Sequence, residues 1–153
     1  MGGSGEEGRP LLIGEYAHTL DGKGRLTVPA RFREHLGDRF IVTLGLDGCL
    51  AGYAFAEWAR LTERLKTLPM TSRDARAFLR LLLAGATEVE VDRQGRVLIP
   101  PRLRAAAEIT DEVVLVGLDT RMEIWARARW EAYQAEARAV FETTAEKLVD
   151  QGL

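Results

Sequence analysis

Cysteine and histidine are scarce in this sequence of 153 residues, which has Cys49, His18 and His35 and no others. One chain therefore cannot form a disulfide or a Cys/His zinc site, which fits a reducing cytoplasm. Long apolar runs are missing as well. The longest, residues 79–86, is interrupted by Arg80 and is far shorter than the ~20 residues of a membrane-spanning helix. We expect no membrane segment, metal or other cofactor.

A large excess of one charge is also absent. The 21 Lys and Arg residues against 23 Asp and Glu residues give a net charge of −2 and a pI near 5.8, which excludes a polycationic protein that coats DNA. Hydrophobic residues make up 46% and charged residues 29%, as in folded soluble proteins. We expect the glycine-rich residues 1–10 to be a flexible leader outside the fold.

A repeated segment organises the chain. Residues 21–33 recur 71 positions later as residues 92–104, with six of thirteen positions identical. Three further positions match in character: Leu26/Val97, Val28/Ile99 and Phe32/Leu103. A unit of roughly 45 residues is near the lower limit for an independent hydrophobic core. Two copies of one unit are therefore expected to pack into a single barrel-like core of α+β class.

Hydrophobic periodicity predicts a hairpin, a helical turn and a second hairpin in each copy. The expected strands are residues 15–20, 25–28, 39–44 and 49–53, then 88–91, 96–99, 112–116 and 122–125. Helices are expected at residues 57–68, from a capping-box sequence at 71–74 to a C′ glycine at Gly85, and at 127–148. The last carries an apolar stripe that docks on its own domain or on a neighbouring subunit: Trp130, Tyr133, Ala137, Val140, Phe141 and Leu148.

These elements divide the chain into five parts. A leader at residues 1–10 precedes a first repeat at 15–60, connecting helices at 61–86, a second repeat at 88–131, and a C-terminal helix and tail at 132–153.

The pattern Asp-x-x-Gly-Arg occurs once in each copy, where it predicts a turn. Asp21 and Asp92 accept local N–H groups and orient the arginines, while Gly24 and Gly95 supply a positive φ. Strand alternation places Lys23, Arg25 and Thr27 on one face and Leu26 and Val28 on the other. The equivalent arginine of copy two is Arg96, but Leu98 replaces Thr27, so the first copy is the better-exposed basic site.

Positive charge gathers around both patterns, because residues 21–33 and residues 92–104 each carry four basic side chains against one aspartate. A two-stranded ribbon that presents arginine fits the major groove of DNA, and several ribbons in one assembly raise the effective concentration of later contacts. The candidate DNA-binding residues are Lys23, Arg25, Arg31, Arg93 and Arg96. For Arg33, phosphate contact and pairing with Glu34 or Asp38 on a solvated surface stay equal alternatives.

Other candidate sites are weaker. Gly22-Lys23-Gly24 lacks the spacing of a phosphate-binding loop. His18 suits a packed or surface position, and Cys49 suits a buried structural thiol. Nothing in the sequence argues for an enzyme or a small-molecule substrate. A scaffold whose basic loops bind acidic proteins is the alternative to DNA binding.

Together, Leu20-Asp21-Gly-Lys-Gly-Arg25, Val28-Pro29, Gly45-Leu-Asp-Gly-Cys49 and the second Asp92-x-x-Gly95-Arg96 pattern resemble the MraZ family of bacterial transcriptional regulators. The resemblance covers about residues 12–148. It implies two tandem SpoVT-AbrB-type domains that form a swapped-hairpin barrel, ring-like homo-oligomers, a cytoplasmic and nucleoid-associated location, and binding to short direct repeats in the promoter of the division and cell-wall gene cluster. It places the DNA-contacting arginines at Arg25 and Arg96.

Overall fold

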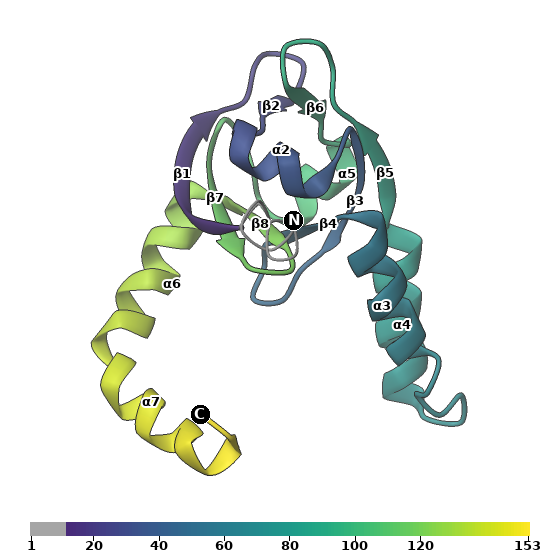
Figure 1. Ribbon diagram of the computed structural model, residues 1–153, viewed down its shortest axis with the longest axis vertical. Coiled ribbons are helices and arrows are strands. Elements are labelled where there is room, and N and C mark those ends of the chain that lie inside the picture. Colours follow the sequence, from purple (N-terminus) through teal and green to yellow (C-terminus); the bar gives the residue numbers. More distant parts are fainter. Residues whose placement is uncertain (1–11) are drawn as a thin grey trace, which may run out of the picture.

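The computed structural model describes residues 12–153, so the leader predicted at residues 1–10 lies outside the described residues (Figure 1). The first repeat forms β1 (Ile13–Thr19), β2 (Arg25–Thr27), α2 (Ala30–Leu36), β3 (Arg39–Leu44) and β4 (Leu50–Tyr53), followed by α3 (Phe55–Leu65) and α4 (Arg73–Gly85). The second forms β5 (Thr87–Glu90), β6 (Arg96–Leu98), α5 (Pro101–Ala106), β7 (Glu112–Leu118) and β8 (Met122–Ala126), followed by α6 (Arg127–Ala139), α7 (Phe141–Leu148) and a 3₁₀ turn (Val149–Gln151). The predicted α+β class is confirmed.

The two repeats exchange strands. The main sheet has six antiparallel strands in the order β1-β7-β8-β4-β3-β5, and β2 pairs with β6 in a separate two-stranded ribbon. The predicted second hairpins, β3–β4 and β7–β8, are confirmed, whereas the first hairpin of each copy is wrong because β1 pairs with β7 and β5 with β3. This exchange gives each short strand a hydrogen-bonded neighbour and builds the single core that the swapped-hairpin resemblance implies.

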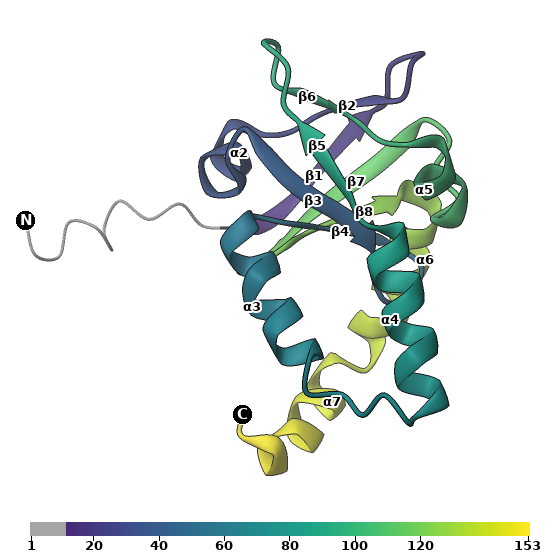
Figure 2. The ribbon, with the colours of Figure 1, turned by 90° about the vertical axis from the view of Figure 1, so that its right-hand side faces the viewer.

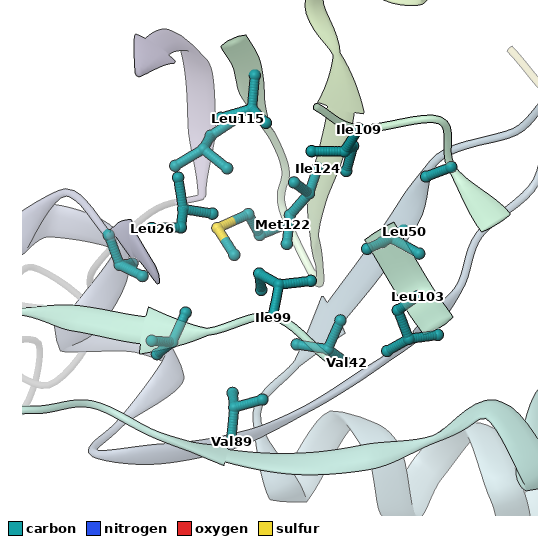
Figure 3. Close-up of a cluster of buried hydrophobic side chains, with 14 of the residues drawn as sticks. Leu26, Val42, Leu50, Val89, Ile99, Leu103, Ile109, Leu115, Met122 and Ile124 are labelled. Carbon is teal, nitrogen blue, oxygen red and sulfur yellow. The ribbon is translucent and has the colours of Figure 1, made fainter. Parts of the chain in front are cut away.

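The core lies between the main sheet and the β2–β6 ribbon. Leu26 and Val28 are no more than 1% exposed, while Thr27 between them is exposed, so the predicted alternation is confirmed. Their counterparts in the second repeat are equally buried, as are the equivalent helix residues Phe32 and Leu103. Figure 3 shows side chains of both repeats meeting in this core: Leu26, Val42, Leu50, Val89, Ile99, Leu103, Ile109, Leu115, Met122 and Ile124. The ribbon therefore has one face fixed on the core and one face free.

Helix α4 begins as predicted and ends differently. Ser72 is the N-cap, and its hydroxyl accepts the N–H of Ala75 at 3.2 Å. Gly85 is the last helical residue rather than a left-handed C′ glycine, so that prediction is wrong. The helix ends because Ala86 is extended, with φ −71° and ψ 139°, and leads directly into β5.

The helix expected at residues 127–148 is two helices, because Val140 leaves helical geometry at φ −117° and ψ 18°. Only the start of the predicted apolar stripe docks on the chain's own domain: the rings of Trp130 and Tyr133 lie 5.3 and 5.1 Å from the ring of Trp125. Val140 is 51% and Phe141 71% exposed. Figure 1 shows α6 and α7 extending away from the sheet.

Candidate nucleic-acid interface

The two Asp-x-x-Gly-Arg patterns lie in loops at the same end of the molecule. One loop joins β1 to β2 and the other joins β5 to β6. Figures 1 and 2 show both loops projecting from the end that is opposite α3, α4 and α7. Their position follows from the pairing of β2 with β6, which brings segments 71 residues apart in the sequence side by side. The fold thus unites the two motifs in one surface.

In the first loop, the Asp21 carboxylate organises the turn. Its Oδ1 accepts the backbone N–H groups of Lys23 and Arg25, each at 2.9 Å, and its Oδ2 accepts Nε of Arg25 at 2.7 Å. The turn requires a residue at φ +85°, which Gly24 adopts without strain. The backbone N–H of Arg25 is the main cause that lowers the pKa of Asp21 to about 2, so the carboxylate is charged at neutral pH.

The second loop repeats this geometry. Oδ1 of Asp92 accepts the N–H groups of Gln94 and Arg96 at 2.9 Å, and Oδ2 accepts Nε of Arg96 at 3.0 Å. The backbone N–H of Arg96 is again the main cause that lowers the pKa of Asp92. One contact breaks the symmetry, since Nη1 of Arg96 also reaches Oδ2 of Asp21 at 3.4 Å. Arg96 is therefore shared between the two loops.

Arg25 keeps the donor groups that recognition needs. Its Nε is held by Asp21, and its Nη1 and Nη2 have no hydrogen-bond partner among residues 12–153. About a third of the side chain, 32%, is exposed, against 25% for Arg96. A guanidinium anchored through Nε presents its two outer nitrogens in a fixed plane, which matches two neighbouring acceptors such as guanine O6 and N7 or two phosphate oxygens. The first loop is therefore the freer of the two.

The structure brings four of the five predicted DNA-binding residues to this end. Lys23 and Arg93 are exposed in the loops beside Arg25 and Arg96, and neither forms an ion pair within the described part of the chain. Arg31 is exposed on the first turn of α2 and makes no described hydrogen bond to either loop.

Sequence reasoning missed the role of a second pair of arginines, Arg33 and Arg104. The proposed pairing of Arg33 with Glu34 or Asp38 is wrong, because its Nε donates to the carbonyl oxygen of Val28 at 3.0 Å. Arg104 makes the same bond to Ile99. The recurrence of an arginine at the last position of both 13-residue segments is the signal that could have identified them.

The remaining candidate groups lie elsewhere. Cys49 is buried, its Sγ lies 3.2 Å from the carbonyl oxygen of Leu46, and burial raises its pKa to about 12, so the prediction of a structural thiol is confirmed. Across residues 12–153, no three His, Cys, Asp or Glu side chains come together as metal ligands. Nor does any helix in this range combine the length and apolar character needed to cross a membrane.

Comparison with known proteins agrees with the internal repeat. The family model described as "MraZ protein, putative antitoxin-like" matches residues 11–81 and again residues 82–152. The protein named transcriptional regulator MraZ of Desulforamulus reducens is 56% identical over 140 residues, which cover 92% of this chain and 99% of that protein. The protein of the same name from Moorella thermoacetica is 54% identical, over 92% of this chain and 98% of that protein. The one from Caldicellulosiruptor saccharolyticus is 52% identical, over 94% of this chain and 100% of that protein. The chain therefore belongs to the MraZ family of transcriptional regulators.

Proposed function

We propose that this chain regulates transcription by binding double-stranded DNA sequence-specifically, through the loops that carry Arg25 and Arg96. Its targets are short direct repeats in the promoter of the division and cell-wall gene cluster, including its own gene, and it binds them as a ring-like homo-oligomer at the nucleoid in the cytoplasm. The observation that carries this proposal is the anchoring of Arg25 through Nε, which leaves both outer nitrogens without a partner among residues 12–153.

The distribution of charge supports the choice of DNA as the ligand. Lys23 and Arg93 belong to the β1–β2 and β5–β6 loops, and Arg25 and Arg96 begin β2 and β6, so four basic residues gather at one end of a protein whose net charge is −2. The Arg25 and Arg96 side chains are fixed by Asp21 and Asp92, so little conformational freedom is lost when they bind. Local positive charge attracts phosphates, while the overall negative charge limits nonspecific binding to nucleic acid.

A mobility-shift assay tests DNA binding and separates it from the scaffold alternative. The probe is a duplex that spans the region upstream of the chain's own gene. Wild type and Arg80→Ala, an exposed arginine on α4 outside the loops, are expected to bind equally. Arg25→Ala combined with Arg96→Ala is expected to abolish the shift. Equal binding by this double variant and wild type would refute the assignment, and a wild type that fails to bind the duplex but binds acidic proteins would favour the scaffold.

Two exposed apolar surfaces support self-assembly. On α7 and the residues beside it, Val140, Phe141 and Val149 are 51%, 71% and 60% exposed. The second surface is a groove of about 400 Å³ against α3 and α4, whose lining includes Phe78 and Leu81. Because they lie on different parts of the chain, a contact between them is head-to-tail, and a head-to-tail contact produces a ring when the rotation closes.

Sedimentation velocity tests the assembly. Wild type is expected to sediment as a closed oligomer, and Phe141→Ser as smaller species, since the substitution removes the one aromatic ring of α7, which is exposed. Thr143→Ala, an exposed neighbour on the same helix, is the matched control and is expected to retain the wild-type mass. A monomeric wild type would refute the ring, and an unchanged mass of Phe141→Ser would remove α7 from the interface.

A further inference from the structure

Arg33 and Arg104 occupy equivalent positions in the two repeats and make equivalent contacts. Arg33 lies on α2 and donates from Nε to the carbonyl oxygen of Val28 at 3.0 Å. Arg104 lies on α5 and donates from Nε to the carbonyl oxygen of Ile99 at the same distance. Each bond joins a helix to the end of the ribbon strand of its own repeat. The bonds fix the direction in which each guanidinium points.

Both guanidiniums point at the loop of the other repeat. A Cβ placed on Gly24 would lie 2.6 Å from Cζ of Arg104, and a Cβ placed on Gly95 would lie 3.1 Å from Cζ of Arg33. Each arginine therefore rests directly against the glycine that precedes the DNA-binding arginine of the opposite repeat. A side chain at Gly24 would overlap the Arg104 guanidinium, and one at Gly95 would crowd that of Arg33; both glycines are buried.

Backbone hydrogen bonds connect the same residues across the two repeats. The N–H of Val28 donates to the carbonyl oxygen of Gly95 at 2.9 Å, and the N–H of Ile99 donates to that of Gly24 at 3.1 Å. Val28 thus binds Gly95 through its N–H group and Arg33 through its carbonyl oxygen. Ile99 does the same for Gly24 and Arg104. Each loop is fixed by residues of the other repeat.

Charge neutralisation does not explain these arginines. No carboxylate of residues 12–153 lies within ion-pair distance of Arg33 or Arg104. In contrast, Arg25 and Arg96 are paired with Asp21 and Asp92. What Arg33 and Arg104 contribute in the described structure is a planar group and a directed Nε–H, which lysine lacks.

We propose that Arg33 and Arg104 are positioning residues that act across the repeats. Arg104 holds the Gly24–Arg25 loop, and Arg33 holds the Gly95–Arg96 loop, so that the two loops meet DNA as one rigid unit. Substitution of an arginine in the second repeat therefore weakens the DNA contact of the first, and the converse holds as well. The inference rests on the proposed function only for its consequence in DNA binding, because the contacts themselves are independent of DNA.

A double-mutant cycle on the upstream duplex tests the consequence. Arg104→Lys keeps the positive charge but removes the planar guanidinium and its Nε–H. We expect this substitution to weaken DNA binding about tenfold in wild type but less than about twofold in the Arg25→Ala background. Arg33→Lys, the matched control, is expected to weaken binding by the same factor with and without Arg25→Ala. If Arg104→Lys costs the same factor in both backgrounds, or binds like wild type, the inference is overturned.

Hydrogen exchange followed by mass spectrometry tests the positioning without DNA. Arg104→Lys is expected to speed amide exchange at least about fivefold in the peptide that covers residues 20–26, with little change in the peptide that covers 91–97. Arg33→Lys is expected to do the reverse. Exchange that rises in the loop of the substituted arginine's own repeat, or equally in both loops, overturns the inference. If the Arg25→Ala, Arg96→Ala double variant binds DNA like wild type, the proposed function fails while this measurement still decides the positioning.

Discussion

Replacement of Arg25 by lysine separates base recognition from phosphate contact. The two outer nitrogens of Arg25 have no partner in the described part of the chain, and they suffice for one bidentate contact to a guanine. Such a contact contributes about 1–3 kcal/mol of discrimination, and a tenfold change corresponds to about 1.4 kcal/mol. Lysine keeps the positive charge but cannot form the bidentate pair. Arg25→Lys is therefore expected to lower the ratio of promoter affinity to nonspecific affinity by about 5- to 140-fold, with little change in the salt dependence.

Fluorescence anisotropy on the upstream duplex and on a shuffled duplex, at several salt concentrations, measures both quantities. Lys23→Ala provides the contrast. Lys23 is an exposed charge beside Arg25, and we expect it to contact phosphate rather than bases. Its removal is then expected to weaken binding to both duplexes equally and to reduce the salt slope by about 0.9 for each phosphate that is no longer neutralised. Arg80→Lys is the control for the arginine-to-lysine change. If Arg25→Lys leaves the affinity ratio unchanged, Arg25 contacts phosphate rather than bases and the reasoning is refuted.

Three further predictions concern stability and reactivity. Phe32→Ala removes a fully buried ring that lies 5.2 Å from the ring of Tyr16, and should lower the free energy of unfolding in urea by about 3–5 kcal/mol; a loss below about 1 kcal/mol would contradict the packing described. The pKa of Asp21 is about 2 in the folded protein against an ordinary 3.8, so the unfolded state binds more protons between these values and stability should fall as pH drops from about 4 to 2. In urea titrations, Asp21→Asn should lack the part of this loss of stability that Asp21 contributes. An identical pH dependence of stability in both proteins would argue against the lowered pKa of Asp21. Because burial raises the pKa of Cys49 to about 12, iodoacetamide at pH 8 should modify the thiol in urea but not in the folded protein, and equal labelling by mass spectrometry in both states would be inconsistent with this.

Periodicity predicts which residues face the core more reliably than which strands pair. The range of β3 agrees with the prediction, and Leu26 and Val28 face the core as expected. Alternation fixes the buried face of a strand, but it suits β1 beside β2 as well as β1 beside β7. Only the packing of both repeats around one core selects the exchanged pairing. Similarly, the break at Val140 has no local signal, because neither glycine nor proline lies near it.

In the candidate site, too, some contacts could be predicted from the sequence and others could not. Contacts within one loop, such as those of Asp21 with Arg25, follow from four residues of separation and are accessible to sequence reasoning. The contacts of Arg104 with Gly24 and of Arg96 with Asp21 join residues about 75 positions or more apart. They depend on the antiparallel crossing of β2 and β6, and no local pattern describes that crossing. Repetition of a residue in both copies is the one sequence signal that points to them.

A hydroxyl-radical footprint on the region upstream of the chain's own gene tests the central claim most directly, since it shows both where the protein binds and how often. On the proposed function, an assembly that presents several pairs of arginine loops binds a repeated DNA site. Wild type is expected to give short protections at regular intervals, and the Arg25→Ala, Arg96→Ala double variant to lose all of them at the same concentration. Protections that persist in the double variant, or a single protected segment without regular spacing, would contradict the claim.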